Sequence, residues 1–379
     1  MKINFTMTEV ERTGGVRVLF EIANRLSERG HDVTIVTLGK SGSHSWFPLK
    51  SKIIFAENER SLVKGKSNSS LLKNVLSVMP NNIASKLKSG APYNTLRAHA
   101  IKVLTEHIPQ DIDINIATFC FSAFSVNDSG AGIPFYYMQH YEPIFFDDNY
   151  TKKLIDKTYL LPLNRIANST WLRVLLRERL CVDSYGPVIP GVEHEVFYPR
   201  AVRKNGSEKL ILALGKSQQW KGLWDLFEAL KVSKKDIPNI KLILYGSEPN
   251  MKELSPVPCD YLTRINDTRL AELYSMADVV VTPSWYESSP LPPLEAMACG
   301  APVVTTRYGT EDYCFNDINC LVVPPKNPKM LSDAILRLLR DSALSEQFRK
   351  EGQRTAKQFT WENATNKVEQ LFAEILSKS

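Results

Sequence analysis

Two glutamates, Glu287 and Glu295, are the residues of this 379-residue chain whose type and spacing best suit chemistry. They follow an apolar, strand-like run at 277–283 and precede a second such run at 302–305. The paired prolines before Glu295 suit the first turn of a helix, where backbone N–H groups have no intrahelical partner. We therefore expect Glu287 in a loop and Glu295 in the first turn of the helix after it. In an open α/β sheet, ligands bind there, at the carboxyl ends of the strands.

The chemistry of this pair fits a ligand that carries both hydroxyl groups and phosphate. Carboxylate oxygens accept hydrogen bonds from sugar hydroxyls, and the N-terminus of a helix favours phosphate. A nucleotide sugar has both groups. The simpler explanation is an acidic loop followed by a glutamate that complements the helix dipole, and the surrounding segments decide between the two.

Composition indicates a globular protein of two or three domains. The net charge of +6, from 47 Lys and Arg against 41 Asp and Glu, is too small to indicate nucleic acid as a partner. The six cysteines form no CxxC pair and none has zinc-ligand spacing, which suggests reduced thiols in a cytoplasmic protein. No apolar run approaches 18 residues and no signal peptide is evident, so we expect no transmembrane helix.

One segment, Ser61 to Thr105, is strongly basic. It contains seven lysines and arginines and no Asp or Glu, and apolar residues lie between the charges. This pattern is typical of a surface that meets anionic lipid, which would place the protein peripherally on the inner face of the plasma membrane. A solvated helix and loop explain the same pattern.

Strand and helix patterns alternate along the chain, which predicts parallel sheets. A strand at 3–7, a loop ending in Gly14-Gly15, a helix at 16–29 and a strand at 33–38 form one βαβ unit. A second alternating set begins at Lys209. We place an N-terminal domain at 1–199 and a C-terminal domain at 200–360, with a last helix at about 361–379 that could pack back on the first domain. Further strands are expected at 112–117, 135–139, 165–168, 210–214 and 241–245, and further helices at 222–230 and 267–276.

A family resemblance is carried by the Gly14-Gly15 loop with the helix after it and by the segments 189–192, 215–222 and 287–304. Through these features the chain resembles the retaining glycosyltransferases of family 4. The resemblance spans nearly the whole chain and is strongest after Pro190. It implies an α/β protein with the GT-B fold, in which two facing Rossmann-like domains with parallel sheets enclose an interdomain cleft.

The resemblance also implies roles for individual residues of the C-terminal domain. Glu295 would bind the ribose diol of the nucleotide, and Glu287 would contact the transferred sugar near the reacting centre. Lys216 and Lys221 would bind the diphosphate. Two ammonium groups beside a strand end can neutralise the charge that grows on this leaving group.

In the N-terminal domain, the resemblance implies that backbone N–H groups at Gly14 and Gly15 approach ligand phosphate. His140, close to the end of a strand, would lie beside the transferred sugar. Glu142 and Tyr141 are weaker candidates for contacts on the acceptor side.

The chain departs from the family at two places. Lys216 stands where arginine is common, so bidentate binding of the diphosphate is lost. Ser288-Ser289-Pro290 stands where a Gly-aromatic-Gly run is common. The proline-rich run at 288–293 contributes few N–H groups, which leaves the amides of Ser289, Leu291 and Leu294. We therefore expect the two lysines and the hydroxyls of Ser288 and Ser289 to take a larger share of donor binding, and this run to set donor preference.

The expected function is retaining transfer of a hexose or related sugar from a nucleotide diphosphate sugar. The acceptor would be a hydroxyl of a glycan or lipid-linked saccharide, in the synthesis of cell-surface polysaccharide or glycolipid. No cofactor or metal is expected, because no acidic cluster typical of a metal site is evident in the sequence. Alternatives are a nucleotide-sugar epimerase and an inactive nucleotide-sugar-binding subunit. A nicotinamide dehydrogenase is disfavoured, because Gly14-Gly15 lacks the G-x-G-x-x-G spacing.

Overall fold

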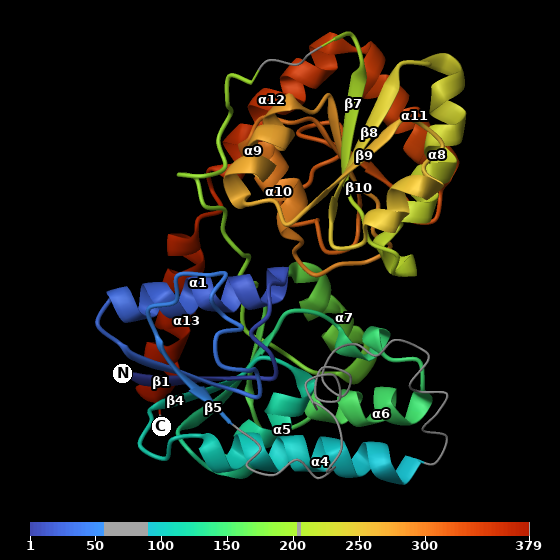
Figure 1. The fold of residues 1–379 in the computed structure, drawn as a ribbon. Helices are drawn as coiled ribbons and strands as arrows, with labels where there is room; N and C mark the ends of the chain where they lie inside the picture. The colour runs from blue at the N-terminus through green and yellow to red at the C-terminus, as the bar shows by residue number, and fades with distance from the viewer. Residues whose placement is uncertain (57–89, 203–205, 379) are drawn as a thin grey trace. The chain divides into compact units, whose positions relative to one another are not determined.

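The computed structural model describes residues 1–56, 90–202 and 206–378. Contacts divide the chain into two compact units (Figure 1). Unit 1 comprises Met1–Asn168, Leu172–Val188 and Thr365–Ser379, and unit 2 comprises Ser169–Trp171 and Ile189–Ala364. Each unit is built on its own parallel sheet.

Six parallel strands form the sheet of unit 1, in the order β3-β2-β1-β4-β5-β6. The strands are β1 (Lys2–Met7), β2 (Asp32–Thr37), β3 (Lys52–Phe55), β4 (Ile114–Ala117), β5 (Ile133–Met138) and β6 (Asn164–Ala167). At the centre, Ile3 of β1 pairs with Val33 of β2 and Ile114 of β4. The strand order reverses between β1 and β4, and such a switch point opens a crevice at the carboxyl ends of the strands.

Helices cover both faces of this sheet, with α1 and α13 on one face and α4 and α5 on the other (Figure 1). The helices are α1 (Gly14–Glu28), α4 (Gly90–His107), α5 (Cys120–Ser129), α6 (Asn149–Thr158), α7 (Thr170–Leu180) and α13 (Trp361–Leu376), with a 3-10 turn η1 at Glu142–Phe145. Phe372 of α13 packs on Phe135 of β5, with ring centroids 4.8 Å apart. Glu369 of the same helix pairs with Arg29 and His31.

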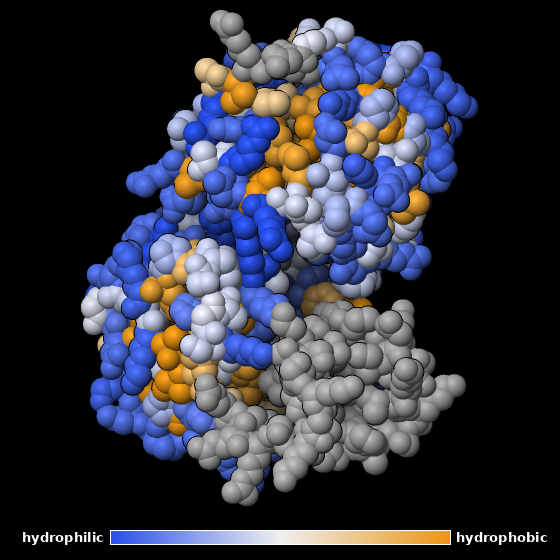
Figure 2. All heavy atoms as spheres, in the orientation of Figure 1, coloured by the Kyte–Doolittle hydropathy of each residue, from blue (hydrophilic) through white to orange (hydrophobic). Residues whose placement is uncertain are grey.

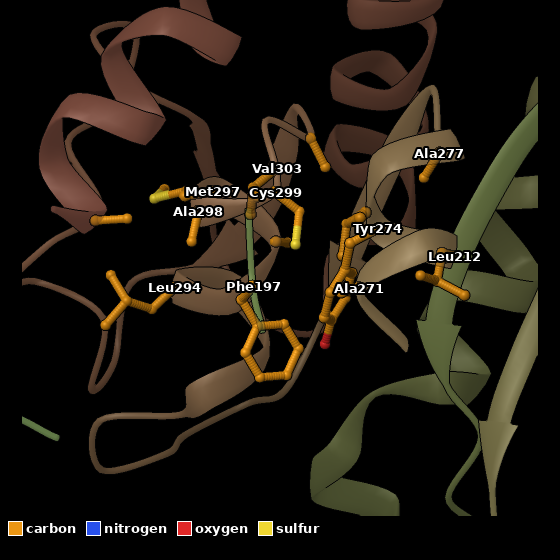
Figure 3. Packing of buried hydrophobic residues seen from close by; sticks show 14 of the residues in the cluster. Phe197, Leu212, Ala271, Tyr274, Ala277, Leu294, Met297, Ala298, Cys299 and Val303 are labelled. Atoms are coloured by element: carbon orange, nitrogen blue, oxygen red, sulfur yellow. The ribbon is translucent and has the colours of Figure 1, made fainter. Parts of the chain in front are cut away.

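The sheet of unit 2 also has six parallel strands, in the order β12-β11-β10-β7-β8-β9. They are β7 (Lys209–Leu214), β8 (Ile240–Gly246), β9 (Cys259–Thr263), β10 (Val279–Thr282), β11 (Val303–Thr306) and β12 (Leu321–Val323). Side chains alternate across the sheet, so that Leu212 enters one core and Ile211 the other. Figure 3 shows Phe197, Tyr274 and Leu294 gathered in the first core.

Helices α9 and α10 contribute to this first core, whereas α8 and α11 contribute to the second. Their bounds are α8 (Leu223–Asp236), α9 (Asp267–Met276), α10 (Leu291–Ala298), α11 (Pro328–Arg340) and α12 (Ser342–Ala356), with 3-10 turns η2 (Gln219–Lys221) and η3 (Pro249–Leu254). Helices therefore cover both faces of the sheet, and the loops at the carboxyl ends of β7, β8 and β10 lie together at one end of the parallel strands.

The start of α1 differs from the prediction. Gly14 and Gly15 form its first turn and do not end a loop. The reason is Thr13, whose side chain accepts a hydrogen bond from the Val16 amide and caps the helix, so that it begins two residues before the apolar pattern does.

Residues 61–89, which make up most of the basic segment, lie outside the described part of the chain, so the predicted membrane contact stays a prediction. No helix among the described residues is both long and apolar enough to cross a membrane. Hydrophilic residues dominate the face in Figure 2, with apolar residues scattered among them on both units. All six cysteines are free thiols, and four of them are buried.

Candidate functional site

Two loops of unit 2 meet where β7 and β10 end side by side. The amide of Trp285, in the loop after β10, donates a hydrogen bond to the carbonyl of Trp220, in the loop after β7, at 2.7 Å. Gly222 has φ +69° and approaches the Pro283 carbonyl so closely that a Cβ atom would overlap it. Only glycine adopts this conformation at such a contact without strain, so the two loops are held in one arrangement.

This contact brings two predicted site residues together. The ammonium group of Lys221 lies 2.6 Å from a carboxylate oxygen of Glu287. The side chains are 26% and 15% exposed, so the ion pair faces solvent and a ligand can reach it. A cation beside a carboxylate can bind a phosphate on one side and a sugar hydroxyl on the other.

The backbone of the Glu287 loop is fixed by the loop that follows β11. The amide of Glu287 donates to the Tyr308 carbonyl at 3.2 Å, and the amide of Ser289 donates to the Gly309 carbonyl at 3.0 Å. A Cβ atom at Gly309, where φ is +85°, would overlap the Glu287 carbonyl. The prediction that the Ser289 amide is a donor for ligand is therefore wrong, because this amide is already bonded within the protein.

The serine side chains of this loop are mostly enclosed, with Ser288 7% and Ser289 6% exposed. The Ser288 hydroxyl lies 2.8 Å from that of Ser169. Ser289 has φ +57°, a left-handed conformation that is uncommon outside glycine. Leu291 starts α10, so its amide has no intrahelical partner and remains the predicted backbone donor.

Glu295 is the fifth residue of α10, not part of its first turn, because the helix starts at Leu291 and the two prolines fill that turn. Its carboxylate is 6% exposed and accepts a hydrogen bond from Tyr274 at 3.4 Å. The Tyr274 hydroxyl is 3.0 Å from that of Tyr245. Burial raises the pKa of both phenols, so they stay neutral. A carboxylate has several lone pairs, which makes the Tyr274 contact compatible with a ligand hydroxyl.

Lys216 follows β7 and has a carboxylate neighbour that the sequence did not reveal. Its ammonium group donates to the Ser247 hydroxyl at 2.7 Å and lies 3.5 Å from Glu248. The Ser217 amide donates to the other oxygen of Glu248 at 2.9 Å. The feature that could have identified Glu248 as a neighbour of Lys216 is its position in the sequence, two residues after the carboxyl end of β8, which pairs with β7.

In unit 1, the N-terminus of α1 lies beside the loop that carries His140. A Cβ atom at Gly15 would lie 3.4 Å from the Gln139 side chain, whereas one at Gly14 would meet nothing within 4 Å. The amides of both glycines belong to the first helical turn, where phosphate binds favourably. His140 lies two residues past β5, with its ring centroid 4.9 Å from that of Phe145.

Glu142 lies inside unit 1 and is 2% exposed. Its carboxylate accepts hydrogen bonds from the Cys120 amide at 2.6 Å and from the Tyr136 hydroxyl at 2.9 Å. Burial raises the pKa of this carboxyl to about 7, although both hydrogen bonds oppose the shift. The enclosure favours a role in holding the loop over contact with an acceptor. Tyr141 is also buried, and its hydroxyl donates to Asp156 at 2.7 Å.

Within the described residues, no group of three or more His, Cys, Asp or Glu side chains is arranged to hold a metal ion. The predicted independence of metal stays a prediction, because activity in the absence of metal is what would test it.

Residues 197–355 match the family model described as glycosyl transferases group 1. O-antigen chain mannosyltransferase B of Escherichia coli is 39% identical over 108 residues, which cover 28% of each chain. This chain spans about half the length, or less, of several curated relatives that it matches.

Solved structures resemble the whole chain. Sucrose-phosphate synthase from Thermosynechococcus elongatus has a TM-score of 0.74 and 18% identity, with 100% of both chains covered. Anabaena HepE, solved in complex with UDP-glucose, has a TM-score of 0.73 and 17% identity, also over 100% of both chains. The predicted α/β architecture is confirmed, since each unit has a parallel six-stranded sheet with flanking helices and the chain matches GT-B glycosyltransferase structures.

Proposed function

We propose that this protein is a retaining glycosyltransferase that moves a hexose or related sugar from a nucleotide diphosphate sugar to an acceptor hydroxyl. The observation that carries the proposal is the grouping of Lys216, Lys221 and Glu287 on loops at the carboxyl ends of β7 and β10, followed by Glu295 on α10. The match of residues 197–355 to the glycosyl transferases group 1 model covers all four positions and supports it.

The donor would be bound by complementary groups. Lys216 and Lys221 would bind the diphosphate, the Leu291 amide would add a backbone donor, and Glu295 would accept hydrogen bonds from the ribose diol. Glu287 would contact the transferred sugar. That Anabaena HepE was solved with UDP-glucose supports a nucleotide sugar as the ligand class. For unit 1, the amides of Gly14 and Gly15 and the His140 ring remain the groups that the sequence predicts for contact with ligand.

In the proposed reaction, the bond between the anomeric carbon and the diphosphate oxygen breaks, and a bond from that carbon to the acceptor oxygen forms. The acceptor proton passes to the departing diphosphate, so no separate base is needed, and the two lysines would neutralise the leaving group in place of a metal ion. Lys216 and Lys221 stabilise the negative charge that develops on the leaving group, and such preorganised charges lower the barrier when they act more strongly in the transition state.

Glu295→Ala tests the donor site directly. A hydrogen bond to a charged group contributes about 1.5–3 kcal/mol, so loss of the ribose contact should weaken binding roughly 10- to 100-fold. The assay is calorimetric titration with UDP, GDP and ADP sugars, whose ribose carries the diol. The matched control is Glu228→Ala, an exposed glutamate on α8. Unchanged affinity and turnover in Glu295→Ala would refute the ribose assignment.

Product analysis separates the proposed transferase from its alternatives. With donor alone, an epimerase forms an epimer without a second substrate, whereas a transferase at most hydrolyses the donor slowly. With donor and acceptor, transfer by the purified chain excludes an inactive binding subunit.

The acceptor would be a growing glycan or a lipid-linked saccharide at a membrane surface. The name of the Escherichia coli relative, an O-antigen chain mannosyltransferase, supports a polysaccharide acceptor. The basic segment Ser61 to Thr105 motivates the membrane contact, and this part of the proposal rests on sequence alone. Sedimentation with phosphatidylserine-containing liposomes should carry the protein down at low salt, and absence of binding there would remove the membrane role.

A further inference from the structure

Glu248 makes the contacts that an anionic ligand would be expected to make. One of its carboxylate oxygens accepts a hydrogen bond from the Ser217 amide at 2.9 Å, and the other lies 3.5 Å from the Lys216 ammonium group. A backbone amide next to a lysine at the end of a strand is a typical arrangement for binding phosphate. In this structure, the protein's own carboxylate occupies it.

The loop that carries Glu248 is held in place by Tyr261. The Tyr261 hydroxyl accepts a hydrogen bond from the Glu248 amide at 2.8 Å and donates one to the Gly215 carbonyl at 2.7 Å. The loops after β7 and β8 are thus joined through one phenol. The carboxylate is 24% exposed and Lys216 is 28% exposed, so both groups remain within reach of a ligand.

We propose that Glu248 is an internal counterion of the donor site, which competes with the diphosphate for Lys216 and the Ser217 amide. This inference rests on the proposed function. Both lysines of the site then have a carboxylate partner, Glu287 for Lys221 and Glu248 for Lys216. A diphosphate entering the site must replace the Glu248 contacts or bind beside this charge, and either route lowers its affinity.

The affinity that a ligand loses through competition with Glu248 depends on the charge of the ligand. A nucleotide sugar carries about two negative charges on its diphosphate, whereas the nucleoside diphosphate product gains up to one more because its terminal phosphate ionises with a second pKa of about 6. Repulsion by Glu248 therefore weakens the product more than the donor. The carboxylate selects for the substrate and promotes release of the product.

Glu248→Gln tests the proposal with inorganic pyrophosphate, a probe that does not depend on the unknown nucleobase. Removal of one charge within a few ångströms of the ligand should tighten pyrophosphate binding about three- to tenfold in calorimetric titrations at low salt. Glu253→Gln, an exposed glutamate of η3, should leave affinity unchanged. A second titration uses the pairs UDP with UDP-glucose and GDP with GDP-mannose. For the pair that binds, Glu248→Gln should gain more affinity for the nucleoside diphosphate than for the nucleotide sugar.

Lys216→Ala separates failure of this inference from failure of the proposed function. If Lys216→Ala weakens pyrophosphate binding but Glu248→Gln leaves it unchanged or weakens it, Glu248 is not a competitor and the inference is wrong. If Lys216→Ala has no effect, or the wild-type protein does not bind pyrophosphate, the diphosphate site itself has been misassigned. Equal gains for the nucleotide sugar and its product would overturn the assignment of product selectivity.

Discussion

Replacement of Glu142 by glutamine should make the stability of unit 1 less sensitive to pH. The carboxyl group is buried between the Cys120 amide and the Tyr136 hydroxyl, and burial raises its pKa to about 7, from 4.5 in the unfolded chain. Between these two values the folded state binds more protons than the unfolded state, so stability falls as pH rises. The stabilisation is fully present below pH 4.5 and is lost as pH rises through 7.

The magnitude follows from the difference of about 2.5 pKa units. At about 1.4 kcal/mol per unit, wild-type unit 1 should lose at most about 3 kcal/mol between pH 4.5 and pH 8. Glutamine mimics the neutral acid, because its carbonyl oxygen can accept from the Cys120 amide while its NH₂ group faces the Tyr136 hydroxyl, which can also accept. Glu142→Gln should therefore match the wild type at pH 5 and exceed its stability by about 2 kcal/mol at pH 8.

The assay must report on unit 1 by itself, since a chain of two units need not unfold in one step. Hydrogen exchange of peptides that cover β4, α5 and β5, corrected for the intrinsic rate at each pH, gives the free energy of local opening. The control is Glu178→Gln, an exposed glutamate of α7. If wild type and Glu142→Gln show the same dependence on pH, the buried carboxyl does not titrate as argued and the reasoning is refuted.

Two further outcomes are expected. In urea unfolding, Gly222→Ala should destabilise unit 2 by several kcal/mol, because the new Cβ atom overlaps the Pro283 carbonyl at φ +69°, and it should also weaken donor binding. The control is Gly206→Ala, at φ +92° with nothing within 4 Å of the Cβ position. This variant isolates backbone strain and should cost only about 1 kcal/mol. Donor hydrolysis or transfer should persist in excess EDTA, and loss of activity that magnesium or manganese restores would show that the reaction needs a metal.

Much of the fold could be predicted from local patterns, because the central strands are short apolar runs and their helices have one apolar face. An example is the first βαβ unit, which was predicted as a strand at 3–7, a helix at 16–29 and a strand at 33–38. The edge strand β6 was expected at 165–168, whereas the edge strands β3 and β9 were not predicted. In β3 and β9 no residue is fully buried, so their sequences lack the apolar signal that marks a buried strand.

The candidate site could also be predicted only in part. The glutamates and lysines were identified by type and position in the chain, but the partners of the lysines depend on which strands are neighbours. Lys221 reaches Glu287 because β10 pairs with β7, and Lys216 reaches Glu248 because β8 pairs with β7 on the other side. The predicted position of Glu295 within α10 differs from the observed one by a single residue, since the helix starts at Leu291 and not at the prolines.

The packing of α13 against the first βαβ segment has a consequence for the order of folding. Glu369 pairs with Arg29, 340 positions away in the sequence, and Phe372 packs on Phe135. Contacts across such separations carry a large loop-closure cost and form slowly. Unit 1 therefore cannot complete its core during synthesis until residues 365–376 have left the ribosome, whereas the residues of unit 2 are all available earlier. We expect unit 2 to fold first and nascent unit 1 to expose the apolar surface that α13 later covers.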